Sequence, residues 1–254
     1  MEKISVRDIN FNELEKLSCQ GTNSVVYRYN DDLIKIFKGL SLKEKLNIYK
    51  LYKMLDGINI EGVILPKQFI MKHGFLVGYI TDFVDKYICV SDKYEVVGDF
   101  NINEYFKVVI QASKILREIH NHGVTVQDFS FENVLINEVG NCYYIDFDGS
   151  LYQGIGNNLV SYLFYDYMIN YRKDKVVVGN NLDKISMLLS FFQTFFNRSI
   201  QYVSRSDYDN LASRINTLKN LKAMALLLWD KNENLWLKEI PYLDEVIDLN
   251  DKVV

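Results

Sequence analysis

Apolar, β-rich runs separated by polar turn residues predict two β-hairpins in the first third of the chain. The runs "SVVYRY" and "LIKIF" are rich in β-branched and aromatic residues and flank the turn-forming triplet Asn30-Asp31-Asp32, which predicts a hairpin over residues 24–37. The runs "VILPKQFI" and "FLVGYITDFV" predict a second hairpin, in which Gly74 supplies the turn. Between the two hairpins, spacings of three and four predict a helix over residues 41–55, with Glu44 on its apolar face.

Helical periodicity dominates the rest of the chain. Apolar residues recur at spacings of three and four from Ile102 to His122, which predicts a long amphipathic helix that ends at Gly123. Two further helices are predicted near residues 182–197 and 207–229, whereas residues 85–101 show no clear period and are interpreted as a connector. The predicted order is therefore a β-rich part, a connector and a mainly helical part, which is an α+β fold class.

The composition narrows the classes of protein and of site. Of the 254 residues 48% are hydrophobic and 24% charged, as in a typical globular protein, and a formal net charge of −4 gives no basic field for nucleic acid. Cys19, Cys89 and Cys142 are too few and too widely spaced for a zinc site or a disulfide framework, which favours the reducing cytoplasm. The most apolar run, "ISMLLSFFQTFF", is twelve residues long and contains polar side chains, so no membrane association is expected.

The segment "VTVQDFSFENVLINEVGNCYYIDFDGS", residues 124–150, contains the residues best suited to chemistry. It predicts a short hairpin in which Asn133 starts one strand and Asp146 ends the other, so these two side chains are expected to meet. A carboxylate and an amide oxygen are hard ligands suited to Mg²⁺, and Asp128 lies on the turn that precedes them. The alternative interpretation is that Asp and Asn only form the turns at the ends of the hairpin.

The spacing of these polar residues favours a functional site. Asn133 lies five residues after Asp128 and thirteen before Asp146, and with this spacing the segment resembles the catalytic loop and metal-binding segment of the protein-kinase-like fold superfamily, H-R-D-x-x-x-x-N followed by D-F-G. The chain is similar to a small bacterial or phage-type Ser/Thr protein kinase domain. The resemblance implies a bilobal fold with an N-lobe over residues 1–84, a C-lobe over residues 85–254 and an ATP cleft between them. In this chain the motifs read Val126-Gln127-Asp128, Asn133 and Asp146-Phe147-Asp148-Gly149.

The resemblance also implies a catalytic set. Lys35, in "LIKIF", matches the lysine that contacts the α- and β-phosphates of ATP. Asn133 and Asp146 match the ligands of Mg²⁺, and Asp128 matches the residue that orients an acceptor hydroxyl and accepts its proton. ATP and Mg²⁺ are therefore the implied cofactors, and a hydroxyl-bearing acceptor is the implied partner.

Both implied lobes contribute to the nucleotide site. The stretch "YITDFVD" matches the strand that runs into the hinge, where Thr81 is the gatekeeper and the backbone groups of Asp82 and Val84 would bond an adenine edge. Two sets of residues complete the implied site: a reduced glycine-rich loop at Gly21, Ser24 and Val26, and apolar side chains around the purine ring at Leu17, Val26, Ile34, Leu135 and Ile145.

Two acidic residues have both a functional and a local interpretation. By the resemblance, Glu44 pairs with Lys35; by its place in Ser41-Leu42-Lys43-Glu44, it closes a capping box at the start of a helix, and the sequence favours neither. Asp183 matches the buried aspartate that supports the catalytic loop, and it is also a first-turn acid of the kind that the helix dipole favours.

The chain departs from the family pattern beside the catalytic aspartate. Val126 and Gln127 replace the family's His and Arg, so control through a phosphorylated activation loop is not expected. Ser130 stands where protein Ser/Thr kinases carry a lysine that contacts the γ-phosphate, which weakens the assignment to protein kinases specifically. Residues 159–172, which are dense in Tyr and Phe, are expected to pack onto the helical part.

The expected function is transfer of the γ-phosphate of ATP to a Ser or Thr hydroxyl of a protein. One alternative is a small-molecule hydroxyl kinase of the aminoglycoside or choline kinase type, because these enzymes also lack the lysine that Ser130 replaces. Another alternative is a nucleotide-binding pseudokinase that acts as an interaction module.

Overall fold

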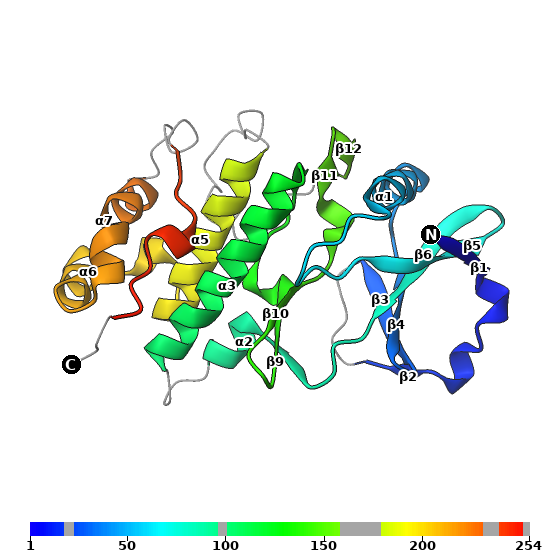
Figure 1. Cartoon of the computed structure of the whole chain (residues 1–254), viewed down its shortest axis with the longest axis horizontal. Helices are drawn as coiled ribbons and strands as arrows, with labels where there is room; N and C mark the ends of the chain where they lie inside the picture. The colour runs from blue at the N-terminus through cyan, green and yellow to red at the C-terminus, as the bar shows by residue number, and fades with distance from the viewer. Residues whose placement is uncertain (18–22, 96–100, 158–178, 231–238, 251–254) are drawn as a thin grey trace.

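The computed structural model describes residues 1–17, 23–95, 101–157, 179–230 and 239–250. Gly21 and residues 159–172 lie outside the described residues. The predicted α+β class is confirmed: the N-terminal part is rich in strands and the C-terminal part is mostly helical, at the right and left of Figure 1. Among the described helices, none is both long and apolar enough to cross a membrane.

A six-stranded sheet forms the N-terminal part, in the order β1-β5-β6-β4-β3-β2. The predicted hairpins are confirmed as β3–β4 and β5–β6, and β1 joins β5 in parallel. The register places Lys35 opposite both Val26 and Tyr79, so these three side chains share one face of the sheet. The strands span Glu2–Ser5 (β1), Glu15–Lys16 (β2), Ser24–Tyr29 (β3), Asp32–Phe37 (β4), Pro66–Lys72 (β5) and Phe75–Asp82 (β6).

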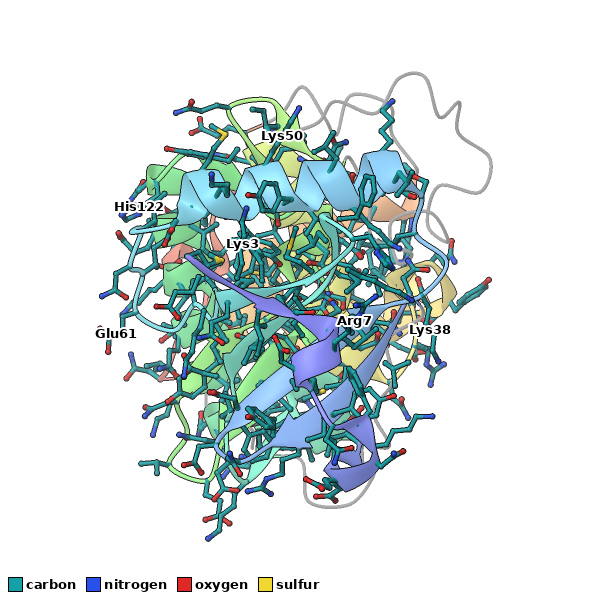
Figure 2. The ribbon with its side chains drawn as sticks, turned by 90° about the vertical axis from the view of Figure 1, so that its right-hand side faces the viewer. Lys3, Arg7, Lys38, Lys50, Glu61 and His122 are labelled. Atoms are coloured by element: carbon teal, nitrogen blue, oxygen red, sulfur yellow. The ribbon has the colours of Figure 1, made fainter. Side chains whose placement is uncertain are left out.

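The helix predicted over residues 41–55 is confirmed as α1 (Leu42–Leu55), which lies across one face of the sheet (Figure 1). Its buried Leu51 and Tyr52 pack toward the sheet, where the ring of Tyr52 lies 5.4 Å from that of Tyr79. In Figure 2 the exposed Lys50 marks the outer side of this helix. Fully burying a side chain such as Leu51 contributes about 1.5–3 kcal/mol to stability, so these contacts fix α1 against the strands.

The first residues of the chain cover the opposite face of the sheet. After β1 the backbone makes two 3₁₀ turns, η1 (Val6–Asp8) and η2 (Phe11–Glu13). Together these segments enclose a small separate core of Ile34, Ile70 and Ile80. The sheet is therefore buried on both faces, and the strand that carries Lys35 is supported from behind.

The segment interpreted as a connector has regular structure. It contains β7 (Tyr87–Cys89) and α2 (Val90–Glu95). β7 pairs with β9 (Val134–Asn137), which pairs in turn with β10 (Cys142–Tyr144) to form a three-stranded sheet. A three-residue strand has no detectable period of its own, because its partner 45 or more residues away decides the pairing.

Stacked aromatic rings hold the main helices of the C-terminal part together. The predicted helix from Ile102 is confirmed as α3 (Ile102–Asn121), and it packs beside α5 (Asn180–Phe196). Tyr105 on α3 stacks on Phe191 of α5 with ring centroids 5.6 Å apart, and its hydroxyl donates to the Phe191 carbonyl. Within the described residues these rings belong to the larger hydrophobic core.

The prediction of a single helix over residues 207–229 is wrong. The chain forms α6 (Arg205–Ala212) and α7 (Asn216–Trp229), with the buried Ile215 in an extended conformation between them. Continuous apolar spacing hid this break, because both helices bury faces against the same core.

Several short elements complete the described part of the chain. β8 (Val124–Thr125), β11 (Leu151–Tyr152) and β12 (Ile155–Gly156) form a second three-stranded sheet. Single 3₁₀ turns follow at η3 (Phe131–Asn133), η4 (Phe147–Gly149), η6 (Ile200–Tyr202) and η8 (Leu243–Glu245).

Gly78 allows β6 to approach β4 beside Lys35. A Cβ at Gly78 would lie 2.2 Å from the Lys35 carbonyl oxygen, so Gly78→Ala should lower the free energy of unfolding by about 2–3 kcal/mol through overpacking. Gly74→Ala is the matched control, because its Cβ meets nothing within 4 Å and only its φ of +82° adds strain, about 1 kcal/mol. Urea unfolding of both variants checks this order, and equal losses would contradict it.

Candidate functional site

Asp183, in the first turn of α5, anchors the loop that carries Asp128. Its side chain is fully buried and accepts backbone hydrogen bonds from Val126 at 2.6 Å and Gln127 at 2.7 Å. The Nε2 atom of His120 lies 2.9 Å from the same carboxylate. The predicted contact between Asp183 and this loop is therefore confirmed, and it holds Gln127 at a φ of +66°.

The loop and the following hairpin bring Asn133 and Asp146 together. The backbone N–H of Ile145 donates to the Asn133 carbonyl at 3.1 Å, which joins the start of β9 to the residue after β10. The predicted hairpin is confirmed, and with it the closeness of Asn133 to Asp146 along the backbone. Asn133 also donates its Nδ2 hydrogen to the Asp128 carbonyl at 3.1 Å, which leaves its Oδ1 atom as the acceptor of the side chain.

Lys35, on β4, faces the segment that follows β10. Its Nζ atom lies 2.7 Å from an Asp146 oxygen and 2.8 Å from an Asp148 oxygen. Asp148 accepts a further hydrogen bond, 2.8 Å long, from the hydroxyl of Tyr52 on α1. One lysine therefore joins the sheet to two carboxylates of the segment that follows β10.

Glu44 is not the partner of Lys35, and its implied place in the nucleotide site is corrected. Its carboxylate accepts the Ser41 backbone N–H at 2.7 Å, while its own N–H donates to the Ser41 hydroxyl at 3.2 Å. This is the capping-box alternative, and these hydrogen bonds with Ser41 lower the pKa of Glu44. At the third helical position the side chain turns back to an otherwise unpaired backbone donor rather than across to the sheet.

Burial and neighbouring charges set the ionisation of the cluster. Burial, followed by the charge of Asp146, raises the pKa of Asp128 to about 6. Burial also opposes ionisation of Asp146, yet the Lys35 ammonium lowers the pKa of that carboxyl below its ordinary value. Burial raises the pKa of Asp148 to about 6, and this pKa rises although Lys35 favours the ionised form. For Lys35, burial is outweighed by Asp146 and Asp148, which raise its pKa well above the ordinary value.

A cavity of about 310 Å³ opens beside this cluster, between the sheet and the β9–β10 hairpin. Most residues that the sequence implied for a nucleotide site line it, and they come from both parts of the chain. These residues are Ser24, Val26, Lys35, Thr81, Asp82, Val84, Asn133, Leu135, Ile145 and Asp146.

Two of the implied purine contacts lie elsewhere. The implied purine contact of Ile34 is wrong. Ile34 is fully buried on the far face of the sheet from Lys35, because neighbouring residues on a strand point to opposite faces. Leu33, two residues before Lys35, lines the cavity in its place. Leu17 is half-buried and donates its backbone N–H to Val26, but it is not among the described residues that line the cavity.

Sequence reasoning missed several residues of the cavity wall. Strand alternation and hairpin register were the signals that could have found Leu33 and Tyr79, since both share a face with Lys35. The ring centroid of Tyr79 lies 5.7 Å from the Lys35 ammonium. The remaining missed residues lie at the cavity through strand pairings or loops that have no local sequence signal. The full set of missed residues is Leu33, Ile64, Tyr79, Tyr87, Cys89 and Glu132.

Thr81 and Asp82, at the end of β6, line the cavity and are held by contacts with neighbouring residues. The Thr81 hydroxyl donates to the Leu65 carbonyl at 3.1 Å. Asp82 forms an ion pair with Lys67, which also pairs with Asp32 at 2.8 Å. These contacts fix the end of β6 where it meets the cavity.

The donor set of the site suits a cation that keeps part of its water shell. Within the described residues, no group of three or more His, Cys, Asp or Glu has the geometry to hold a metal ion. Asn133 Oδ1 and the Asp146 carboxylate together offer two hard oxygen ligands, which fits Mg²⁺, because Mg²⁺ takes few protein ligands and completes its shell with water and phosphate oxygens.

Comparison with models of known protein families gave no match, and a search of curated proteins gave none either.

The raised pKa of Asp128 predicts a pH-dependent stability. An acid whose folded pKa, about 6, exceeds its ordinary 3.8 binds its proton more tightly in the folded state, so its ionised form costs stability above pH 6 and costs none below about pH 4. Asp128→Asn should therefore stabilise the protein at pH 8, by at most about 3 kcal/mol, and the gain should vanish near pH 4. Thermal unfolding at both pH values, with the exposed Glu118→Gln as control, tests this; an equal effect at both would contradict it.

Proposed function

We propose that the chain is an ATP- and Mg²⁺-dependent phosphotransferase with a bilobal protein-kinase-like fold. The observation that carries the proposal is the convergence of Lys35, Asn133 and Asp146 at one cavity whose other walls are largely apolar. These residues come from segments about 100 residues apart, and the sequence alone implied them as one phosphate and metal site. Clustered charge beside an apolar slot suits a ligand with a flat ring and a phosphate chain.

Each group has a role in binding. Val26, Leu33 and Leu135 would enclose the purine ring, and the strand end at Asp82 would align its edge. Lys35 would pair with phosphate oxygens. Asn133 and Asp146 would hold Mg²⁺, which supplies positive charge to the phosphates when bound.

Asp128 would act on the acceptor. As the acceptor oxygen bonds to the γ-phosphorus, the bond from that phosphorus to the ADP oxygen breaks and the hydroxyl proton passes to Asp128. A pKa of about 6 makes Asp128 a stronger base than an ordinary Asp, yet leaves it mostly ionised at neutral pH. The hydrogen bonds of Asp183 and Asn133 to the loop hold Asp128 in place for this step.

The proposed acceptor is a Ser or Thr hydroxyl of a protein. Ser130 favours the second candidate, a small-molecule hydroxyl kinase, because it is buried at the start of η3 where a γ-phosphate-contacting lysine would stand in a protein kinase. The third reading is a nucleotide-binding pseudokinase that acts as an interaction module.

An ATP transfer assay tests the proposal. With labelled ATP and Mg²⁺, wild-type protein should phosphorylate itself, a generic protein substrate or a small alcohol from a panel of sugars, aminoglycosides and amino alcohols. Asp128→Asn should lower transfer by about 10²–10⁴-fold with ATP binding changed less than about twofold, because it removes only the base. Asp146→Asn should abolish transfer and the effect of Mg²⁺ on ATP binding, as should chelation of Mg²⁺. Glu118→Gln is the control.

The outcomes separate the three functions. Transfer to protein supports the protein kinase, and transfer only to a small alcohol supports the second candidate. A rise in melting temperature with ATP but equal turnover in wild type and both variants would leave the interaction module. If ATP neither binds nor is consumed, the proposal is refuted.

A further inference from the structure

Lys35 has two carboxylate partners, and they differ in how much they face the cavity. The side chain of Asp146 is 36% exposed and lines the cavity, whereas that of Asp148 is 13% exposed and that of Lys35 is 12% exposed. Asp148 is thus the inner partner and Asp146 the outer one. Only the outer carboxylate is positioned to meet a ligand in the cavity.

Both oxygens of Asp148 are committed to the protein. One lies 2.8 Å from Lys35 Nζ, and the other accepts the Tyr52 hydroxyl at 2.8 Å. Tyr52 is itself almost fully buried on α1 and packs edge-on to Tyr79, so it has little freedom to move. A carboxylate held at both ends, and not among the described residues that line the cavity, is placed to orient its neighbours.

The backbone at Asp148 is unstrained, because this residue does not have a positive φ. Asp148 lies within the 3₁₀ turn η4. The residue just before this turn, Asp146, adopts the left-handed conformation with a φ of +63°. This kink aims Asp146 and Asp148 at the same lysine from one short segment.

We infer that Asp148 is the positioning residue that holds Lys35 toward the phosphates of the bound nucleotide, and that Tyr52 connects this ion pair to α1. The inference rests on the proposed function, in which Asp146 contacts the metal ion and Lys35 contacts phosphate. Asp148 then keeps a charged partner on Lys35 that the ligand does not compete for. The acid on α1, Glu44, does not hold Lys35, because its carboxylate bonds the backbone of Ser41 in the capping box.

In this assignment α1 is connected to the lysine through an uncharged donor, the Tyr52 hydroxyl, which bonds the Asp148 carboxylate. The hydroxyl of Tyr52 donates to Asp148, and no charge is carried by α1 itself in this contact. Tyr52→Phe should therefore weaken the site less than loss of the Asp148 charge does.

A double-mutant cycle tests the ion pair without any nucleotide. Asp148→Asn is made in wild type and in a Lys35→Met background, and Glu44→Gln, which keeps its capping hydrogen bonds, is the matched control. In the Lys35→Met background Asp148 is a buried carboxylate beside Asp146, so Asp148→Asn should shift the urea unfolding midpoint more favourably there than in wild type. Glu44→Gln should shift the midpoint equally in both backgrounds.

Calorimetry then tests the positioning role with two ligands. Asp148→Asn should weaken binding of Mg²⁺·ATP about tenfold or more but change adenosine binding less than about twofold, because only ATP has phosphates for Lys35 to contact. Tyr52→Phe should weaken ATP binding about two- to fivefold, and Glu44→Gln less than about twofold. A merely structural role for Asp148 would weaken binding of both ligands equally.

The two hypotheses fail in different ways. If wild type binds neither adenosine nor ATP, the proposed function is refuted, while the cycle still decides whether Asp148 or Glu44 is coupled to Lys35. Additive effects of Asp148→Asn and Lys35→Met, or coupling of Glu44 to Lys35, would overturn the inference about Asp148. So would equal loss of adenosine and ATP binding.

Discussion

The ammonium group of Lys35 connects the two parts of the molecule. It extends from the central strand β4 to Asp146 and Asp148, which belong to the segment after β10. A buried ammonium needs charged or hydrogen-bonding partners, since an unpaired charge at this depth costs several kcal/mol. The positions of the sheet, of α1 through Tyr52 and of the β9–β10 hairpin are therefore all constrained by one side chain.

The buried carboxylate of Asp183 fixes the loop that carries Asp128, as the ammonium of Lys35 fixes the sheet. It satisfies two backbone donors whose loop conformation leaves them without partners in regular structure. Acids are thus concentrated where the chain is least regular. Asp128 and Asp148 both have raised pKa values, because burial and nearby carboxylates disfavour their ionised forms. Such a cluster sacrifices stability, which is common at functional sites.

Much of the fold and part of the site could be predicted from local patterns. Both hairpins and the long helix α3 have strong periodicity, and hairpin geometry alone brought Asn133 to Asp146. Ile34 was misassigned although alternation along β4 contained the answer, since Lys35 and Leu33 must share a face. For Glu44, the two interpretations had the same sequence signature, and only the three-dimensional direction of the side chain separated them.

Other features had no local signal. β7 is a strand only because β9 lies beside it, and α6 and α7 read as one helix because their buried faces are in phase. The partnership of Asp148 with Lys35 was also not predicted, because it depends on the left-handed kink at Asp146 and on Tyr52, 96 residues away.

The first residues of the chain have a further consequence for how the molecule behaves among its neighbours. Their strand β1 occupies the outer side of β5, while the two-residue β2 ends the sheet on the other side. Open strand edges attract strands from other molecules, and short edge strands limit this. Among the described strands both borders of the sheet are short, which limits such pairing.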